Sequence, residues 1–187
     1  MRKEAEKLLQ RLAKEIRKCR SCPLWKTRTK AVSGEGGFKK KLFFVGEAPG
    51  RNEDLSGKPF CGIAGRFFDK MLGKAYLSRE DIFVTGAVKC RPPHNRKPKK
   101  SEIEKCKPFL LKQIKILKPR LIVLLGKTAL EAFQIKGKLS ELHGKLINKD
   151  NYVFFLTFHP AAAMRFPKIR ELSFRDMKKL GKLIRNR

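Results

Sequence analysis

Four of the five cysteines have a spacing that suits metal binding. Cys19 and Cys22 form a C-x2-C motif that a proline closes. Cys90 and Cys106 lie far along the chain, with fifteen residues between them. Four thiolates can hold either a tetrahedral zinc ion or an iron–sulfur cluster. The alternative is that these cysteines are inert packing residues, which are common in protein interiors. Cys61 has no partner at such a spacing, and we expect it to be a packing residue near a pocket.

A carboxylate, an aromatic ring and a histidine suggest a pocket for a flat polar ring. Glu47 follows the apolar run 42–45 and lies in a turn rich in glycine and proline. Phe60 lies in a second glycine-punctuated loop, and His159 follows the apolar run 152–158. Ligands of open α/β sheets bind at the carboxyl ends of the strands, so these groups should meet at one edge. A lone histidine after a strand can instead be a purely structural hydrogen-bond partner.

The charge of the chain indicates a polyanionic partner. Lysine and arginine number 46 against 17 aspartates and glutamates, which gives a formal net charge of +29 over 187 residues. The alternative, a lysine-rich surface with the ion-pair networks of a thermophile, would need both signs of charge. Because the basic residues are spread over the whole chain, we expect a basic face or groove, with nucleic acid as the partner.

Two segments are candidates for that contact. The first is a proline-rich loop, 91–100, whose basic residues include Arg91, Arg96 and Lys97. Its prolines and charge predict a rigid element that binds the phosphates of the nucleic acid. The second is 161–165, where three alanines precede Met164 and Arg165. There Met164 would be an apolar wedge in a groove and Arg165 a phosphate contact. The alternatives are a solvated basic loop and an ordinary helix start with Met164 in the core.

The rest of the composition fits one intracellular domain. The length suits a single domain with a sizeable core, which we expect to span residues 1–187. No apolar run approaches the ~20 residues of a membrane span, and the amphipathic start lacks a signal-peptide core. An odd number of cysteines disfavours a disulfide framework in such a chain. We therefore expect a cytoplasmic protein.

Apolar runs that alternate with helical patterns predict the fold. The runs typical of buried strands are 42–45, 82–88, 121–125 and 152–158. Helices are expected at 2–17, at 64–76, from a capping-box pattern at Ser101 as far as Pro119, after Gly126, and from Leu172 onward. Residues 136–151 are interpreted as a glycine- and lysine-rich connection. This order predicts an α/β fold, a three-layer α/β/α sandwich with a central four-stranded, mainly parallel sheet.

Four motifs together carry a family resemblance. They are GEAPG at 46–50, GKPFCGIAG at 57–65, KCRPPHNRKP at 89–98 and HPAAAMR at 159–165. In this order, and with the four cysteines, they resemble the family 4 uracil-DNA glycosylases, the iron–sulfur members of their superfamily. The resemblance runs from about Cys19 to Arg165. It implies an enzyme that flips uracil out of DNA, hydrolyses its N-glycosidic bond and starts base excision repair in the cytoplasm or nucleoid of a prokaryote.

The resemblance also implies a cofactor and a base pocket. A structural [4Fe–4S] cluster would be held by Cys19, Cys22, Cys90 and Cys106. It would staple the N-terminal helix to the body and order the loops that meet DNA. Phe60 would stack on the extruded uracil, and the pocket around it would include Gly46, Ala48 and Gly86.

The implied chemistry matches the residue types. Glu47 would stabilise the cationic sugar or orient the attacking water, and His159 would stabilise charge on a ring oxygen of the base. Residues 161–165 would enter the minor groove, with Met164 and Arg165 at the tip. We expect a monomer that acts on single- and double-stranded DNA. A repair enzyme can also bind a sliding clamp, but the chain shows no clear clamp-binding motif and we predict no such partner.

Two positions depart from the family pattern. Gly86 stands where the family usually has an asparagine that reads the polar edge of uracil, and Cys61 stands where it more often has an aliphatic residue. Gly86 therefore leaves open a glycosylase of altered base preference, for example for hypoxanthine. A third hypothesis is a non-catalytic iron–sulfur module that only binds nucleic acid. The presence of Glu47, Phe60 and His159 together disfavours that third hypothesis.

Overall fold

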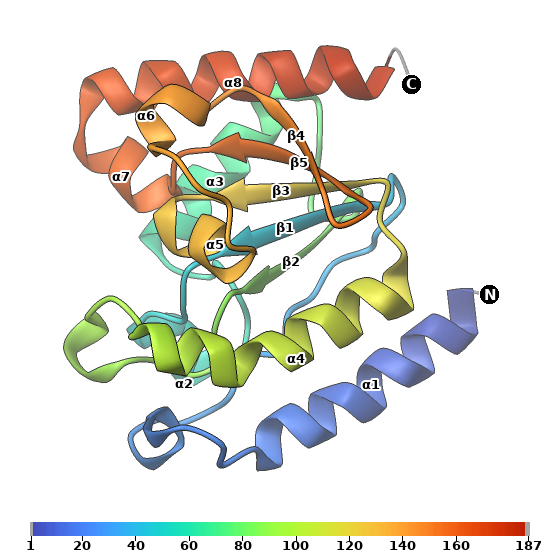
Figure 1. Ribbon diagram of the computed structural model, residues 1–187, viewed down its shortest axis with the longest axis vertical. Coiled ribbons are helices and arrows are strands. Elements are labelled where there is room, and N and C mark those ends of the chain that lie inside the picture. The colour runs from blue at the N-terminus through green and yellow to red at the C-terminus, as the bar shows by residue number, and fades with distance from the viewer. Residues whose placement is uncertain (1, 186–187) are drawn as a thin grey trace.

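A mixed five-stranded sheet forms the centre of the molecule (Figure 1). The computed structural model describes residues 2–185. Its strands lie in the order β2-β1-β3-β5-β4. Their bounds are β1 Leu42–Gly46, β2 Ile82–Gly86, β3 Leu121–Leu125, β4 Leu146–Lys149 and β5 Tyr152–Thr157. Four of them are parallel and correspond to the predicted runs, whereas β4 is antiparallel to β5. The α/β sandwich with a mainly parallel sheet is confirmed.

The sheet has one strand more than the sequence predicts. β4 lies within 136–151, where a connection and no strand was expected. Its side chains alternate between exposed and half-buried, as expected at the edge of a sheet. Asp150 and Asn151 both have positive φ, at 50° and 62°, which makes the tight turn into β5. A four-residue edge strand of mixed polarity has no apolar run by which it could be recognised.

Helices cover both faces of the sheet. Their bounds are α1 Arg2–Lys18, α2 Arg51–Ser56, α3 Ile63–Lys74, α4 Lys100–Leu117, α5 Lys127–Ala132, α6 Leu139–Leu142, α7 Pro160–Arg165 and α8 Pro167–Arg185. Two helix starts differ from the prediction. Helix α8 begins five residues earlier than Leu172. Helix α4 begins at Lys100, and its N-cap is Lys99, whose backbone N–H donates to the Glu102 carboxylate, so Ser101 is not its cap. No helix within 2–185 is both long and apolar enough to cross a membrane.

Alternate residues of each strand face different helices. Phe43 and Val45 of β1 belong to the core that α1, α4 and α5 share with the sheet. Leu42 and Phe44 belong to the core on the other face, which α3 and α8 cover. Because both faces are covered, the central strands are apolar throughout. Helix α1 packs on α4, outside the layer that touches the sheet (Figure 1).

The parallel strands end at one edge of the sheet, on the left in Figure 1. Helices α2 and α7 and the loop before α4 lie beside that edge. The segments that follow β1, β2, β3 and β5 therefore meet there, although they are far apart in the sequence. These are the segments that carry the candidate site residues.

Candidate active site

A cleft of about 310 Å³ opens where the strands end. That volume is at the lower end of the range of small-molecule sites and suits one planar ring. The residues that the sequence placed in a pocket all line it: Gly46, Glu47, Ala48, Phe60, Gly86 and His159.

The ring of Phe60 forms one wall of the cleft. Its position against the strand end leaves room only for glycine at 46, because a Cβ there would lie 2.7 Å from Cζ of the ring. The centroid of the Phe60 ring lies 4.7 Å from that of Phe68, in the core, and 5.8 Å from that of His159, which also lines the cleft. One face of an entering ring would therefore meet an aromatic surface next to an imidazole.

His159 presents a neutral donor to this cleft. Its Nδ1 accepts a hydrogen bond of 3.2 Å from the backbone N–H of Ala161 at the start of α7. Nδ1 can accept only without a proton, so the hydrogen of the neutral ring is on Nε2. Nε2 lies 3.6 Å from the Cβ position of Gly46, at the end of β1. Burial lowers the pKa of His159 to about 4, which keeps the ring neutral at pH 7.

Glu47 is held by a residue that the sequence reasoning missed. Its carboxylate accepts a hydrogen bond from the hydroxyl of Thr128, which is buried in the first turn of α5. Thr128 follows β3 by three residues and so lies at the same edge as the end of β1. That placement was a usable signal, because every strand end of a parallel sheet contributes to one edge.

The floor of the cleft at Gly86 consists of backbone. A Cβ at this position would lie 2.7 Å from the carbonyl oxygen of Val88, so the chain is closely packed there. The carbonyl oxygen of Gly86 accepts a hydrogen bond of 2.9 Å from Nζ of Lys89. Nζ also donates to Thr85 and Gln113, so this buried ammonium group fixes the end of β2. Burial lowers the pKa of Lys89 to about 8.

The basic loop before α4 is fastened to the body by its own charges. Arg96 lines the cleft and donates two hydrogen bonds, of 2.9 and 2.6 Å, to the buried carboxylate of Glu102. Lys97 forms an ion pair with Glu131. Nε of Arg91 donates to the side chain of Asn95 at 2.7 Å, and Asn95 also lines the cleft. These contacts hold the loop beside the cleft.

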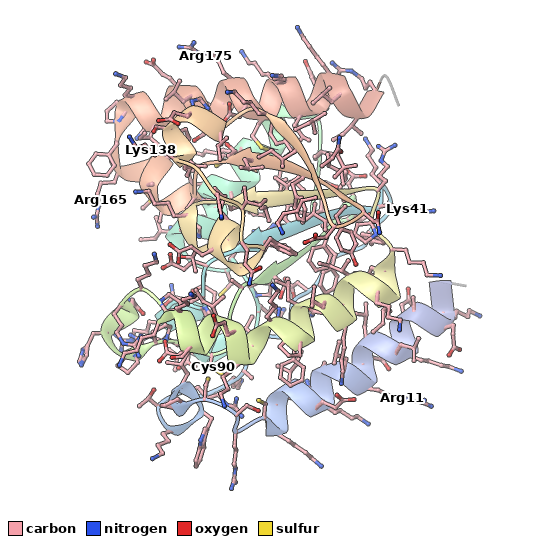
Figure 2. The ribbon with its side chains drawn as sticks, in the orientation of Figure 1. Arg11, Lys41, Cys90, Lys138, Arg165 and Arg175 are labelled. Carbon is pink, nitrogen blue, oxygen red and sulfur yellow. The ribbon has the colours of Figure 1, made fainter. Side chains whose placement is uncertain are left out.

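The segment after His159 forms α7, which begins at Pro160. Met164 and Arg165 are both exposed on it, so the structure does not place Met164 in the core. Figure 2 shows Arg165 projecting from the same side of the molecule as the strand ends. It also shows basic side chains on other sides, such as Arg11 on α1 and Arg175 on α8.

A second, smaller cavity is lined by four free cysteines, Cys19, Cys22, Cys90 and Cys106. Cys90 accepts a hydrogen bond of 3.0 Å from Arg28, and Cys106 accepts one of 3.3 Å from the backbone N–H of Lys89. Burial raises the pKa of the Cys106 thiol to about 11, and it also raises the pKa of Cys22 and of Cys90. Across residues 2–185, no three His, Cys, Asp or Glu side chains are grouped closely enough to hold a metal ion.

Cysteine sulfurs are soft ligands and suit a metal centre bound by thiolates. The N–H groups and the positive charge beside them would tune the charge on sulfur. Cys61, by contrast, is exposed and shares a hydrogen bond of 3.1 Å with the hydroxyl of Ser56. The expectation that Cys61 is a packing residue was wrong, because its side chain is exposed.

Comparison with known proteins identifies the family. Residues 33–180 match the model of the uracil DNA glycosylase superfamily. The chain is 42% identical to the type-4 uracil-DNA glycosylase of Saccharolobus solfataricus, over 90% of this chain and 83% of the relative. It is 40% identical to that of Archaeoglobus fulgidus (92% and 91%) and 38% to that of Thermotoga maritima (96% of each). The chain therefore belongs to the uracil-DNA glycosylase superfamily and, within it, to the type-4 uracil-DNA glycosylases.

Proposed function

We propose that this protein excises uracil from DNA, leaves an abasic site and so starts base excision repair. Its family membership supports this activity. The observation that carries the proposal is the meeting of three groups in one cleft: an aromatic wall, a neutral imidazole donor and an anchored carboxylate. Uracil-containing DNA is the substrate, and the whole chain, 1–187, acts as one monomeric domain.

Uracil reaches the cleft by leaving the base stack. Flipping costs a few kcal/mol, which contacts in the cleft and to the strand must offset. The ring of Phe60 supplies a stacking surface for the extruded base. Met164, exposed on α7, fills the vacated space as an apolar wedge, and Arg165 contacts a neighbouring phosphate. Arg91, Arg96 and Lys97, all in the loop before α4, line the path of the DNA backbone. Ion pairs with Glu102 and Glu131 hold Arg96 and Lys97 in place.

Bond cleavage moves an electron pair from the glycosidic bond onto the base. The uracil anion carries its charge partly on its carbonyl oxygens, and Nε2–H of His159 donates to one of them. A neutral donor serves well here, since it stabilises the charge without transferring a full proton. The sugar becomes cationic, and Glu47 stabilises it or orients the water. That water adds hydroxide to the sugar carbon, and its proton finally neutralises the uracil.

The four cysteines that line the second cavity would hold a [4Fe–4S] cluster. Cys19 and Cys22 follow α1, Cys90 follows β2, and Cys106 belongs to α4. A cluster bound by all four ties α1 to the body and steadies the loop between Cys90 and α4. Its role is structural, and the excision chemistry does not pass through it.

Gly86 supports one alternative, a changed base range. A site that lacks a hydrogen-bonding side chain for the base edge discriminates less, by ~1–3 kcal/mol. A backbone floor at Gly86 offers no side chain that would favour uracil over hypoxanthine. No observation favours a module that binds nucleic acid without catalysis.

A single-turnover cleavage assay on the purified protein tests the proposal. The labelled oligonucleotides carry uracil opposite guanine, uracil opposite adenine, single-stranded uracil, and hypoxanthine opposite thymine. Alkali then reveals abasic sites. Rapid cleavage at uracil supports the proposal, cleavage only at hypoxanthine establishes the alternative, and tight DNA binding without cleavage refutes both. Glu47→Gln is the control for contaminating glycosylase, because it should bind the same DNA with little cleavage.

A further inference from the structure

Phe60 has an unusual backbone that its surroundings must hold in place. Its φ is +51°, in the left-handed region, which a non-glycine residue adopts at a cost of ~1–2 kcal/mol. Its carbonyl oxygen lies so close to α3 that a Cβ at Gly65 would be 1.8 Å away. Such a conformation persists only where several contacts determine it together.

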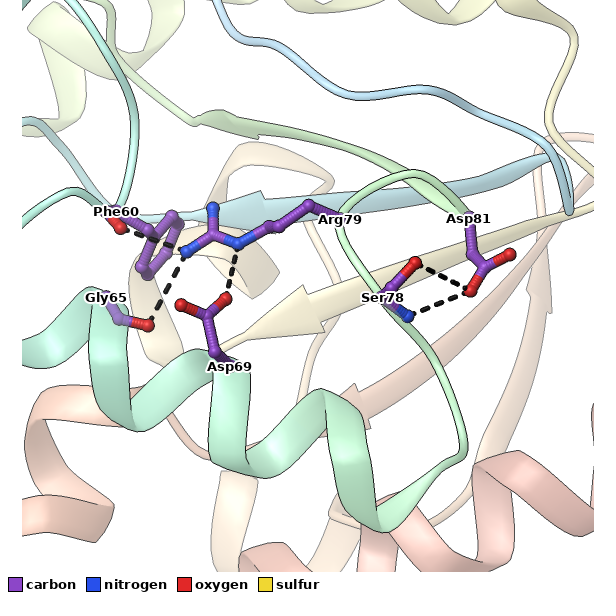
Figure 3. A network of polar contacts seen from close by, with 6 residues as sticks. All are labelled: Phe60, Gly65, Asp69, Ser78, Arg79 and Asp81. Carbon is purple, nitrogen blue, oxygen red and sulfur yellow. Dashed lines mark hydrogen bonds and ion pairs between the residues drawn. The ribbon is translucent and has the colours of Figure 1, made fainter.

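Arg79 supplies these contacts from a distant segment, the turn before β2 (Figure 3). Its Nη2 donates to the carbonyl oxygen of Phe60 at 2.9 Å and lies 3.5 Å from that of Gly65. Its Nε donates to the carboxylate of Asp69 on α3 at 2.5 Å. Its guanidinium also lies 4.9 Å from the centre of the Phe68 ring, against which Phe60 packs.

We infer that Arg79 is a positioning residue that holds the Phe60 ring in place to stack on the flipped base. This inference rests on the proposed function. Arg79 is not among the residues that line the cleft, so it acts through Phe60. Arg79 binds the carbonyl oxygen of Phe60 and Asp69 of α3 at the same time. It therefore fixes the orientation of the Phe60 ring before DNA binds. The flipped base then meets a preorganised surface, and less ordering is needed during the reaction.

The planar guanidinium suits this task better than an ammonium group. Arginine donates in two directions from a rigid fork, here to a carbonyl and to a carboxylate. Lysine can reach one of these partners while keeping the charge. Arg79→Lys should therefore retain part of the effect, whereas Arg79→Gln should lose nearly all of it.

The test is single-turnover excision of uracil from a uracil–guanine duplex at increasing enzyme concentration. It yields the maximal rate and the enzyme concentration at half of it. We expect Arg79→Gln to lower the maximal rate about tenfold, as one charged hydrogen bond would. The half-saturating concentration should stay within twofold, because phosphate contacts lie elsewhere. In a Phe60→Ala background, Arg79→Gln should change the maximal rate less than twofold.

Lys39→Gln is the matched control. It removes one positive charge and an ion pair to Glu80, next to Arg79, without touching Phe60. Three results would overturn the inference. Arg79→Gln could keep the wild-type maximal rate, or Lys39→Gln could lower the maximal rate as much as Arg79→Gln does. The effects of Arg79→Gln and Phe60→Ala on the maximal rate could also be fully additive. If Arg79→Gln fails to fold, Arg79→Lys takes its place, and an intermediate maximal rate is expected. Wild-type chain that leaves uracil uncut refutes the proposed function itself, so the two failures are distinguishable.

Discussion

The hydroxyl of Thr128 donates to the carboxylate of Glu47 across 81 residues of sequence. Thr128 is 1% exposed in the first turn of α5, and Glu47 directly follows β1. The bond therefore joins the ends of two neighbouring strands and gives the carboxylate its orientation before any substrate binds. Such preorganisation is where much of the rate enhancement of a polar site arises.

Removing the Thr128 donor should slow excision without weakening DNA binding. Thr128→Val keeps the shape of the side chain but leaves Glu47 without this bond, so we expect a maximal rate about tenfold lower, as for a charged hydrogen bond of ~1.5 kcal/mol. Single-turnover kinetics on a uracil duplex measure it. Thr128→Ser restores the donor and should recover most of the rate. Equal rates for the valine and serine variants would show that the bond does not matter.

Loss of either polar group in the cleft should separate catalysis from binding. His159→Gln and Glu47→Gln should each lower the maximal excision rate ~10²–10³-fold, the usual effect of removing a donor or charge that stabilises a transition state. The affinity for a uracil duplex should change little, because phosphate contacts dominate it. Gel-shift titration and cleavage of the same oligonucleotide provide the comparison. Excision at the wild-type rate by both variants would contradict the catalytic roles proposed for these residues.

The cysteine cavity predicts a visible effect of substitution. Cys106→Ser should abolish the brown colour and bound iron of the purified protein and lower its melting temperature, because the cluster would then no longer tie α1 to the body. Absorbance, iron content and thermal melting report these changes. Cys61→Ser is the matched control, since Cys61 is exposed and away from the cavity. A Cys106→Ser protein with full iron content would contradict the proposed ligand set.

The sequence predicts well those parts of the fold that local patterns determine. The runs 42–45 and 121–125 are apolar throughout because both faces of their strands are covered, and that pattern is visible in the chain itself. The meeting of Glu47, Phe60 and His159 follows from the parallel topology, in which strand ends share an edge.

The parts that the sequence did not reveal depend on distant partners. β4 is a strand only because it pairs with β5, and its own residues are of mixed polarity. Arg79 donates to the carbonyl oxygen of Phe60, 19 residues away, and Thr128 donates to Glu47, 81 residues away. The capping pattern at Ser101 was misleading because Glu102 reaches back to Lys99 instead. No periodicity encodes such contacts.

Burial of His159 predicts that acid destabilises the protein. Its pKa is about 4 when folded, against 6.5 for an ordinary histidine. Between these values the unfolded chain binds a proton that the folded protein does not, so the free energy of unfolding falls as pH decreases from about 6.5 to 4. Protonation of Nδ1 would also break the hydrogen bond that it accepts from the backbone N–H of Ala161. Above pH 6.5 this contribution is fully present.

Urea unfolding of the wild type and His159→Gln from pH 7.5 to 4 isolates this effect. Glu47, Glu53 and Arg96 line the same cleft but are present in both proteins, so their titration largely cancels in the difference. The stability of the wild type relative to the variant should decrease steadily between pH 6.5 and 4. Exposed His94→Gln controls for the mere loss of an imidazole. A difference that does not vary with pH would mean that His159 titrates alike in both states, and a neutral donor in the cleft would then be unsupported.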